Sequence, residues 1–585
     1  MNLSTRIKSV AMLAIAVAIS GGSAIEVCAT DFDSLRGVIL SKSYVVIKPG
    51  ESDTLAADIL PFDAPAEAVT WQIDDPEVAT VDQDGIVTAL AIGTATLTAT
   101  SREGYKAACT VKVSEKQSDF TRNLSPGGPG GGMGGTPPDM SSDGTPPQMP
   151  QGDSSSSGFG GGFGGGMGGG PGGGMGGRGG GPGGGMGNFG QSSKTVSDNS
   201  DATDPNGYVQ EGGESDIENT EYSSKTSDAN AVKVSGGRLS LTNCTISKLG
   251  GNTGDNDASS FYGLNAAVLA RRGANISITG GSISTKAKGA NGIVAYGGFV
   301  DAADVTINCV DKYSRGIHAT GGGRIEAYNL TVNTKGANSS AIALDRGGGI
   351  VKVIGGDYTA EGKDCAILYS TGDLTVNNIT GCSAQGEIGV IEGDNFIAIN
   401  NSDLTSNAKA SSRGLMILQS GSGDAGFGLN GVITVAGGSL TMTDKDAPLI
   451  EIVTNVTGKI TLDGVKVTVP SGILMTVDYN KRWNTYGATG ELVLSGDGTT
   501  YSGNILTDEY SSARVTVNNG VIWEGAYDTK DEGKLTTLTI NGGTWNLTAD
   551  SCVDKITLTN GATINKNGHL LTCARIKQDS GTIND

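Results

Sequence analysis

The stretch GRIEAYNLTVNTKG, residues 323–336, shows the pattern that fills the C-terminal two-thirds of the chain. Two similar stretches follow it, GGIVKVIGGDYTAEG at 348–362 and GDLTVNNITGCSAQG at 372–386. In each, a run rich in Val, Ile and Thr leads through a corner with Gly or Asn to a second run. A small residue followed by a branched apolar residue recurs with spacings of 24, 25, 25, 23 and 25 residues, at Gly292-Ile293, Gly316-Ile317, Ala341-Ile342, Ala366-Ile367, Gly389-Val390 and Gly414-Leu415.

A fixed period in the twenties is typical of a solenoid. Leucine-rich repeats share this period, but they require Leu at fixed offsets and a helical segment, whereas these runs are β-branched and show no helical periodicity. A coil of about 24 residues accommodates three short strands and three corners. We therefore expect an all-β fold in which residues 206–585 form a parallel β-helix. Val, Ile and Leu should point inward, and Ser and Asn should stack as ladders at the corners.

Residues 1–29 have the features of a signal peptide. Arg6 and Lys8 precede an apolar run at 10–19, and small residues around Ala29 suggest cleavage before Thr30. The apolar run is far below the roughly 20 residues that span a bilayer, and no other stretch is long and apolar enough. We therefore expect a secreted or cell-surface protein with no transmembrane segment after the signal is removed.

Two regions precede the predicted β-helix. Residues 35–115 alternate short apolar strands with turn residues, such as Pro49-Gly50 and the run 82–85, which predicts a small β-sandwich. Residues 116–205 are rich in Gly, Pro and Met. Such a composition buries too little apolar surface to offset backbone ordering, so this region should be a disordered linker.

Composition excludes several classes of function. The chain of 585 residues has a formal net charge of −20, which argues against nucleic acid as a partner because binding to phosphates needs a basic surface. Seven of its eight cysteines lie beyond the signal peptide, and no CxxC pair is present, so neither a disulfide framework nor a zinc site is expected. Cys244 and Cys309 are expected in similar places two coils apart, roughly 10 Å from each other, and therefore as free thiols.

Known catalytic motifs are missing from the sequence. The chain has two histidines, His318 and His569, and no HEXXH, P-loop or EF-hand pattern. No Ser-His-Asp or Cys-His set can be assembled from it. The sequence therefore names no catalytic residue.

Counting from each repeat mark places a mixture of acidic, basic and aromatic side chains on one outward face. The candidates for ligand binding are Tyr296, His318, Asp345, Arg346, Glu392 and Asp394. This face could bind a glycan, or hold Ca²⁺ between Asp345, Glu392 and Asp394. The alternative is a solvated face whose charges pair with their neighbours. No cofactor other than Ca²⁺ is suggested.

The segment DYNKRWNTYGATG, residues 478–490, interrupts the repeat and carries Trp483 and Tyr486. Exposed aromatic rings could form a sugar platform, and the same segment could instead cap the core where the coils lose register. Trp523 and Trp545 lie in predicted strands and are expected in the core or in a cap.

The stretch VTWQIDDPEVATVDQDGIVTALAIGTATLTAT, residues 69–100, resembles the group 2 bacterial immunoglobulin (Ig)-like domain. The resemblance covers roughly the whole 35–115 module and implies that Trp71 is the core aromatic residue and Gly85 the hairpin turn. It also implies an extracellular accessory domain of the kind found in adhesins and beside carbohydrate-active modules. It implies no catalysis.

The segments SRGIHATGGG (314–323) and SSAIALDRGGGIVKVIGG (339–356) resemble a widespread microbial family of right-handed parallel β-helix proteins. This family is similar to pectate-lyase-type helices, which share the pectin lyase fold, and to autotransporter passengers. The resemblance covers nearly all of 230–575 and implies the fold. Its members are described as adhesin-like, and no catalytic motif comes with it.

These observations favour an exported, non-catalytic, adhesin-like protein that presents a β-helix for adhesion or carbohydrate binding. Its expected partners are an extracellular or cell-wall polysaccharide or a host or cell surface. The alternative is a polysaccharide lyase or glycoside hydrolase that acts on an extracellular polysaccharide through the outward acidic residues. A structural surface-layer component is a third interpretation.

Overall fold

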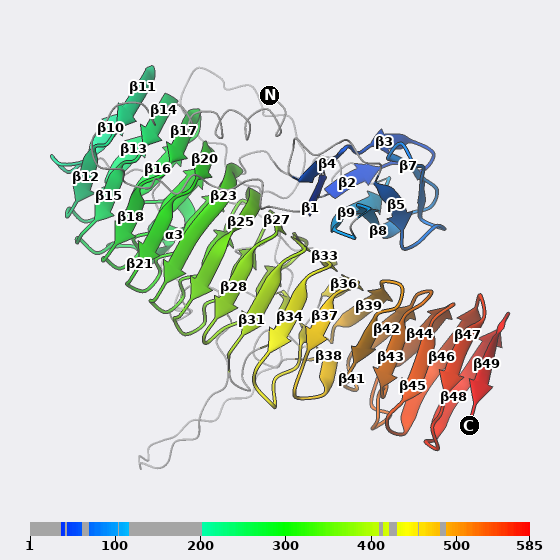
Figure 1. Ribbon diagram of the computed structural model, residues 1–585. Coiled ribbons are helices and arrows are strands. Elements are labelled where there is room, and N and C mark those ends of the chain that lie inside the picture. The colour runs from blue at the N-terminus through cyan, green and yellow to red at the C-terminus, as the bar shows by residue number, and fades with distance from the viewer. Residues whose placement is uncertain are drawn as a thin grey trace, which may run out of the picture.

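The computed structural model describes residues 37–115, apart from 41, 43, 61–68 and 103, and residues 202–585, apart from 409–412, 420–429, 454–455 and 480–486. The predicted signal peptide, nearly all of the predicted linker, and Trp483 and Tyr486 lie outside these described residues. The described chain forms a small β-domain beside a long rod of stacked strands (Figure 1).

The N-terminal domain is a small β-sandwich. Its three sheets are β1 (Gly37–Leu40) with β4 (Ala57–Leu60); β2 (Tyr44–Ile47), β9 (Lys106–Val113), β8 (Gly93–Thr100) and β5 (Thr70–Ile73); and β3 (Ser52–Thr54), β7 (Ile86–Ala89) and β6 (Ala79–Val81). Trp71 is buried in their common core. Gly85 has a φ of 77° in the turn between β6 and β7, where a Cβ atom would lie 2.9 Å from the Trp71 ring. The predictions for Trp71 and Gly85 are therefore confirmed.

The rod is a parallel β-helix with three walls, which we call walls A, B and C. Wall A consists of β10 (Tyr208–Gln210), β13 (Val232–Val234), β16 (Val268–Arg271), β19 (Ile293–Tyr296), β22 (Ile317–Thr320), β24 (Ile342–Leu344), β26 (Leu368–Ser370), β29 (Gly389–Glu392), β32 (Leu415–Leu418), β35 (Ile450–Val453), β38 (Ile473–Asp478) and β41 (Asn504–Thr507). The strands of this wall pair in parallel from each coil to the next, as the solenoid prediction requires.

Walls B and C form one continuous sheet. Wall B consists of β11 (Glu214–Glu218), β14 (Gly237–Thr242), β17 (Ala274–Thr279), β20 (Phe299–Ala303), β27 (Asp373–Asn377), β30 (Phe396–Asn400), β33 (Asn430–Ala436), β36 (Thr457–Asp463), β39 (Thr489–Ser495), β42 (Ser512–Val517), β44 (Leu535–Asn541), β46 (Ser551–Thr559) and β48 (Leu571–Gln578). Wall C consists of β12 (Glu221–Ser224), β15 (Thr245–Lys248), β18 (Ser282–Thr285), β21 (Thr306–Cys309), β28 (Thr380–Ser383), β31 (Asp403–Ser406), β34 (Ser439–Met442) and β37 (Lys466–Thr468). Two long strands, β23 (Gly323–Thr334) and β25 (Gly349–Ala360), pass through both walls.

The inward side chains form one continuous core between Ala231 and Ile564. On wall A the aligned inward residues Ile293, Ile317 and Ile342 are completely buried. Alternate strand positions therefore point inward, as the Val, Ile and Leu pattern predicts. Stacking buries these side chains between the coils above and below, which stabilises each coil only when its neighbours are present.

The corner between walls B and C is built from left-handed residues. Asn243, Asp304, Asn329 and Asn378 have φ values of 52°, 58°, 51° and 55°. Asn and Asp tolerate this conformation better than other residues with a Cβ atom, and their side chains can pair between coils. Asn329 Nδ2 donates to Asp304 Oδ1 at 2.8 Å, and the predicted corner ladders are therefore present.

Two of the repeat marks predicted from the sequence, Ala366-Ile367 and Gly389-Val390, are displaced by one residue, whereas Gly414-Leu415 is aligned as predicted. The structure aligns Ile342 with Leu368 and Gly389, not with Ile367 and Val390. A small residue before the strand is not required in every coil, because Ile367 and Ile388 fill the position that Gly316 and Ala341 occupy earlier. The true coil lengths are therefore less regular than the marks suggest.

Three strands per coil do not continue to the C-terminal end of the described rod. Wall A ends at β41, and the last coils consist of a wall B strand followed by one strand of a five-stranded sheet. That sheet takes the place of wall C and consists of β40 (Thr500–Ser502), β43 (Ile522–Gly525), β45 (Thr544–Leu547), β47 (Ala562–Asn565) and β49 (Gly581–Asn584). Trp523 and Trp545 stack inside it with ring centroids 4.9 Å apart, and both are fully buried.

The described cysteines are all free. Cys309 is buried and ends β21, where it aligns with Thr285 and Lys248. Cys244 is also buried but precedes β15 at the corner, so its expected equivalence with Cys309 is wrong. The free state of both thiols agrees with the sequence prediction.

One helix among the described residues breaks the all-strand pattern, α3 (Asn256–Tyr262), inserted between β15 and β16. The sequence did not predict it. None of the described helices is long and apolar enough to cross a membrane.

Candidate functional site

Helix α3 covers the outer face of wall A near its N-terminal end. Asp255 caps the helix by accepting hydrogen bonds from the backbone N–H groups of Asp257 and Ala258. Gly263 ends it with a φ of 73°. These cap residues hold a helix of only two turns in place, since so short a helix is not stable by itself.

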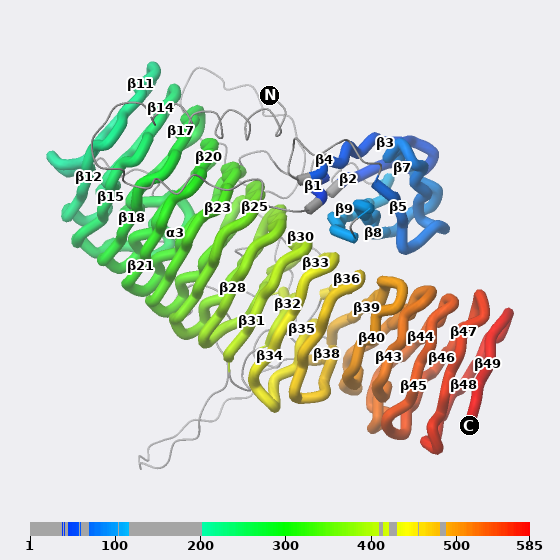
Figure 2. Tube along the Cα trace, viewed as in Figure 1, coloured from blue at the N-terminus to red at the C-terminus, as the bar shows by residue number. Residues whose placement is uncertain are grey.

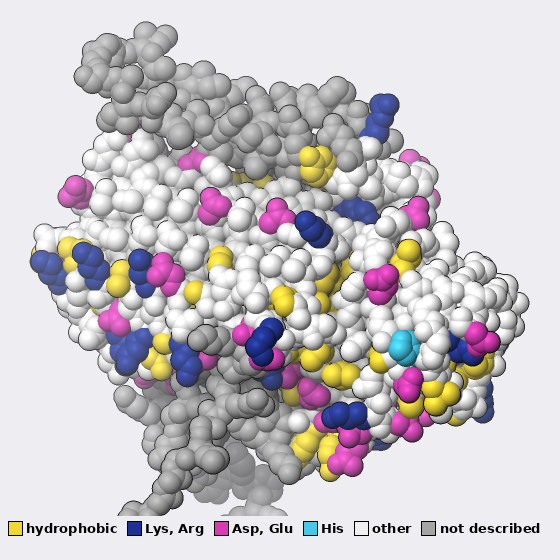
Figure 3. Space-filling view, turned by 60° about the horizontal axis from the view of Figure 1, so that its bottom comes forward, with side chains coloured by type: hydrophobic (Ala, Val, Ile, Leu, Met, Phe, Trp, Pro, Cys, Tyr) yellow, Lys and Arg dark blue, Asp and Glu magenta, His cyan; other side chains and the backbone are white. Residues whose placement is uncertain are grey.

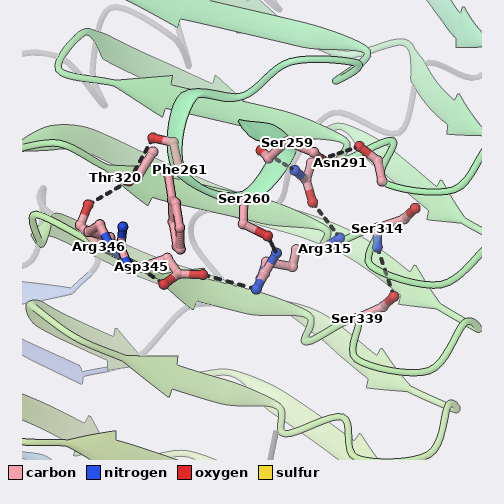
Figure 4. A network of polar contacts seen from close by, with 11 residues as sticks. Ser259, Ser260, Phe261, Asn291, Ser314, Arg315, Thr320, Ser339, Asp345 and Arg346 are labelled. Atoms are coloured by element: carbon pink, nitrogen blue, oxygen red, sulfur yellow. Dashed lines mark hydrogen bonds and ion pairs between the residues drawn. The ribbon is translucent and has the colours of Figure 1, made fainter. Parts of the chain in front are cut away.

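A buried network joins α3 to the strands beneath it (Figure 4). Arg315 donates from Nη1 to Ser260 Oγ at 2.8 Å and from Nη2 to Asp345 Oδ2 at 3.0 Å. Both charged side chains are about 95% buried. The guanidinium of Arg346 lies 4.0 Å from the ring centre of Phe261, which also belongs to α3. The network therefore fastens the helix to wall A through the Arg315–Ser260 hydrogen bond and a cation–π contact, while the ion pair with Asp345 holds Arg315 in place.

His318 lies under the same cover. Its side chain is fully buried, and neither ring nitrogen has a hydrogen-bond partner. Burial, together with the positive charge of Arg315, holds the pKa of the His318 imidazole well below its usual range. His318 is therefore neutral and part of the packing beneath α3.

The structure brings four of the seven predicted site residues together. Tyr296, His318, Asp345 and Arg346 gather around α3, where Tyr262 of the helix packs against the Tyr296 ring with centroids 5.3 Å apart. Trp483 is outside the described residues. The group under α3 is largely closed to solvent.

Glu392 and Asp394 lie further along wall A. Glu392 is buried and occupies the outward row of Asp345 two coils later, roughly 10 Å away. Among the described residues no group of three or more acidic, His or Cys side chains could hold a metal. The expected Ca²⁺ site between Asp345, Glu392 and Asp394 is therefore not formed.

A second polar group lies toward the C-terminal end of wall A. We call it the acidic edge, and it consists of Glu387, Arg413, Glu451, Asp478 and Asp508. Arg413 forms a two-pronged ion pair with Glu451, which projects outward from β35 and is almost fully buried.

Two carboxyl groups, those of Asp478 and Glu387, flank this ion pair, and the pKa of each is strongly raised. Burial raises the pKa of Asp478 to about 7, and the nearby negative charge of Glu451 adds to the effect. Burial raises the pKa of Glu387 to about 7 as well, opposed by Arg413. Each of these two groups is therefore close to half-protonated at neutral pH, while Glu451 is paired with a cation.

An aromatic pair adjoins the acidic edge. The rings of Tyr479 and Tyr510 have centroids 4.9 Å apart, and 51% of Tyr510 is exposed. Asp508 fixes both residues by accepting the backbone N–H of Tyr479 at 2.6 Å and that of Tyr510 at 3.1 Å. Exposed rings beside carboxylates are groups that bind sugars, through stacking and hydrogen bonds respectively.

The part of wall A between the group under α3 and the acidic edge carries an apolar outward row. Figure 3 shows one face of the molecule, on which acidic and basic side chains are scattered among uncharged ones. On wall A the outward row after His318 is apolar and buried through Ala343, Tyr369, Val390 and Met416. This part of the face is therefore not the mixed, solvated surface that the sequence suggested.

Comparison with known proteins identifies the N-terminal domain. A family model described as bacterial Ig-like domain (group 2) matches residues 35–111. Domains of this family occur in extracellular or surface proteins.

Several proteins are similar to shorter parts of the chain. An uncharacterized protein of Clostridium acetobutylicum is 35% identical over 109 residues, 18% of this chain and 11% of the relative. A lacto-N-biosidase of Bifidobacterium bifidum is 46% identical over 69 residues, 12% of this chain and 6% of the relative. An alpha-L-arabinofuranosidase of Bifidobacterium longum subsp. longum is 43% identical over 68 residues, with the same two shares. The chain thus spans only a small part of each of these relatives. Residues 35–111 are a group 2 bacterial Ig-like domain, and the chain after it forms a parallel β-helix.

Proposed function

We propose that this protein is exported and binds carbohydrate outside the cell through the acidic edge of wall A. The observation that carries the proposal is the Tyr479–Tyr510 pair, in which Tyr510 is exposed, beside the carboxyl groups of Asp478 and Asp508. The Ig-like domain supports a surface role. A carbohydrate-related role is supported by two proteins with similar segments, which are named lacto-N-biosidase and alpha-L-arabinofuranosidase.

The chemistry of the edge suits a sugar ligand. A pyranose ring has an apolar face that stacks on an aromatic side chain and hydroxyl groups that donate to carboxylates. The Tyr510 ring offers the first kind of contact, and Asp478 and Asp508 offer the second. Adhesion through such a surface needs no catalytic step.

A polysaccharide panel tests this function. The full chain should be retained on at least one insoluble polysaccharide, and Tyr510→Ala should weaken retention by up to about tenfold, since stacking contributes about 0.5–1.5 kcal/mol. Tyr313→Ala is the matched control, because Tyr313 lies at a different corner of the rod, after β21. Retention that Tyr510→Ala and Tyr313→Ala reduce equally, or no retention at all, would contradict the proposal.

A glycoside hydrolase is the second candidate, and one observation favours it. Asp478, with its pKa raised to about 7, could donate a proton to a leaving group, while Glu451 beside Arg413 supplies a second, ionised carboxylate. New reducing ends that appear with the wild type and disappear with Asp478→Asn would establish this activity. Binding of the wild type to a polysaccharide without such products would leave the non-catalytic function.

A further inference from the structure

The Ig-like domain lies against the middle of the rod, beside wall B (Figure 2). On its side of the contact, Thr96, Thr98 and Thr110 point away from the core of their own domain and are nevertheless at least 95% buried. Outward side chains of a free sheet would be solvated. These threonines are therefore covered by the β-helix, and Thr96 Oγ1 lies 3.1 Å from Thr461 Oγ1.

Wall B offers a matching row of small side chains. Thr375, Ala398, Thr434 and Thr461 are aligned on the outer face of four successive strands, and all are buried. Small residues on both partners let two sheets approach closely. The contact is thus a sheet-on-sheet interface with the outward rows of both partners inside it.

Two asparagines of the rod cap an open strand edge of the Ig-like domain. β2 pairs only with the second half of β9, from Thr110 to Val113. In the first half, the Asn401 side chain accepts the N–H of Lys106 at 2.9 Å and donates to its C=O at 2.6 Å. Asn400 Oδ1 accepts the N–H of Ala108 at 3.0 Å.

The corner ladder orients this cap. Asn400 uses its Nδ2 group to donate to Asn377 Oδ1 at 2.9 Å, which leaves its oxygen directed at β9. Asn401 is the left-handed residue of the same corner, with a φ of 46°. The asparagine ladder therefore supplies both the corner of the coil and the acceptor for a neighbouring strand.

Two ion pairs flank the cap. In one the Ig-like domain supplies the cation, and in the other the rod supplies it. Lys106 of the Ig-like domain pairs with Asp463 of the rod at 2.5 Å, with side chains 17% and 10% exposed. Lys459 of the rod pairs with Asp74 of the Ig-like domain at 3.4 Å, with 11% and 7% exposed, and also donates to Thr94 O at 2.9 Å. Each partner contributes one cation and one anion, so the pairing selects one surface and one orientation.

We propose that the outer face of wall B at β27–β36 is a docking surface for the chain's own Ig-like domain, which acts as a fixed brace and not as a free module. The surface lies on a different wall from the acidic edge, so docking leaves that site open. The docked Ig-like domain lies about seven coils from the first coil of the rod, which is roughly 35 Å. About a dozen residues of extended chain would span that distance. The 86 residues between Glu115 and Ala202 are more than sufficient for docking within one chain.

Hydrogen exchange of the full-length chain tests the proposal through the amides of Lys106 and Ala108. In the wild type these amides should exchange slowly. Lys106→Asp and Asp463→Lys, each alone, should accelerate their exchange by about tenfold or more, because each places like charges in a largely buried contact. The double variant restores the pair with reversed charges and should restore protection. Lys466→Asp, an exposed change on β37, is the control and should have no effect.

Two further measurements separate docking within one chain from an effect of charge alone and from docking between two copies. Asn401→Ala should accelerate exchange of the Lys106 amide without any change in charge, and light scattering should show a monomer, as docking within one chain requires. Unchanged exchange in both single charge variants would overturn the proposal. Protection only in a dimer would assign the surface to the Ig-like domain of a second copy and overturn docking within the chain. Polysaccharide retention in the charge variants should stay unchanged, which separates this test from that of the proposed function.

Discussion

Asp345 shows how an outward residue of a β-helix can become structural. Its carboxylate pairs with Arg315 under α3, where both side chains are about 95% buried. Removing one partner of a buried pair leaves the other charge without compensation. We predict that Asp345→Ala lowers the free energy of unfolding by about 3–5 kcal/mol, measured by chemical denaturation.

An exposed pair on the same rod is the control for this prediction. Lys335 and Glu361 are 3.6 Å apart with side chains 52% and 46% exposed. Glu361→Ala should change the free energy of unfolding by less than about 1 kcal/mol. Equal effects of Asp345→Ala and Glu361→Ala would show that the network under α3 is not what holds the helix.

Glu387 should make stability depend on pH. Its pKa in the folded state, raised to about 7, exceeds the ordinary value of 4.5 that applies in the unfolded chain. The folded state therefore binds the proton more tightly, and this contribution to stability is fully present below pH 4.5 and is lost as the pH rises through 7. We predict that Glu387→Gln gains stability relative to the wild type over this window, by up to about 3 kcal/mol at pH 8.

Denaturation of both proteins at several pH values between 4 and 8 checks this prediction. The difference between wild type and variant isolates Glu387, because the other titrating groups, such as His318, are common to both. A difference that stays constant across the window would contradict the raised pKa.

At the scale of elements, α3 depends on its C-terminal glycine. A Cβ atom at Gly263 would lie 2.6 Å from Leu269 Cδ1 and 2.7 Å from Val294 Cγ1. Gly472 has a similar φ of 68° with open space around it. We predict that Gly472→Ala costs about 1 kcal/mol for the left-handed backbone alone, and that Gly263→Ala costs clearly more. Thermal unfolding of the two variants measures the difference, and equal losses would remove the packing role of Gly263.

The sequence could predict the elements whose pattern repeats. Alternating Val, Ile and Thr with Asn or Gly at the corners specified the strands, the inward rows and the ladders, because stacking imposes the same environment on every coil. It could not specify α3, since two helical turns have no periodic face. Asp255 and Gly263, as cap residues at the right distance, were the available signal.

The candidate site was predicted less well, for a geometrical reason. Counting from small residues placed Tyr296, His318 and Asp345 on the correct wall, because alternation along a strand is reliable over a few residues. Whether such a residue is exposed to solvent depends on the α3 insertion, which comes from another coil. The residue spacing of the repeat carries no information about that insertion. The partners Glu451 and Asp478 come from strands whose spacing is irregular, so their approach to Arg413 needed the structure.

At the scale of the whole molecule, walls A and B of the rod have different roles. Wall B holds the Ig-like domain through Asn400, Asn401 and two ion pairs, and wall A carries the acidic edge. The residues of the docking surface and those of the acidic edge lie on different walls and have no member in common. Docking and ligand binding should therefore be independent.

Stability along the rod should depend on position, because each coil is packed by its neighbours. Leu492 and Ile576 belong to one inward row, which runs through Val515, Leu538 and Ile556. Leu492 is fully buried between two coils, whereas 44% of Ile576 is exposed. We predict that Leu492→Ala lowers the free energy of unfolding by about 2–5 kcal/mol and Ile576→Ala by less than about 1 kcal/mol. Chemical denaturation followed by far-UV circular dichroism measures both changes, and similar losses at the two positions would mean that the last coil is covered in solution.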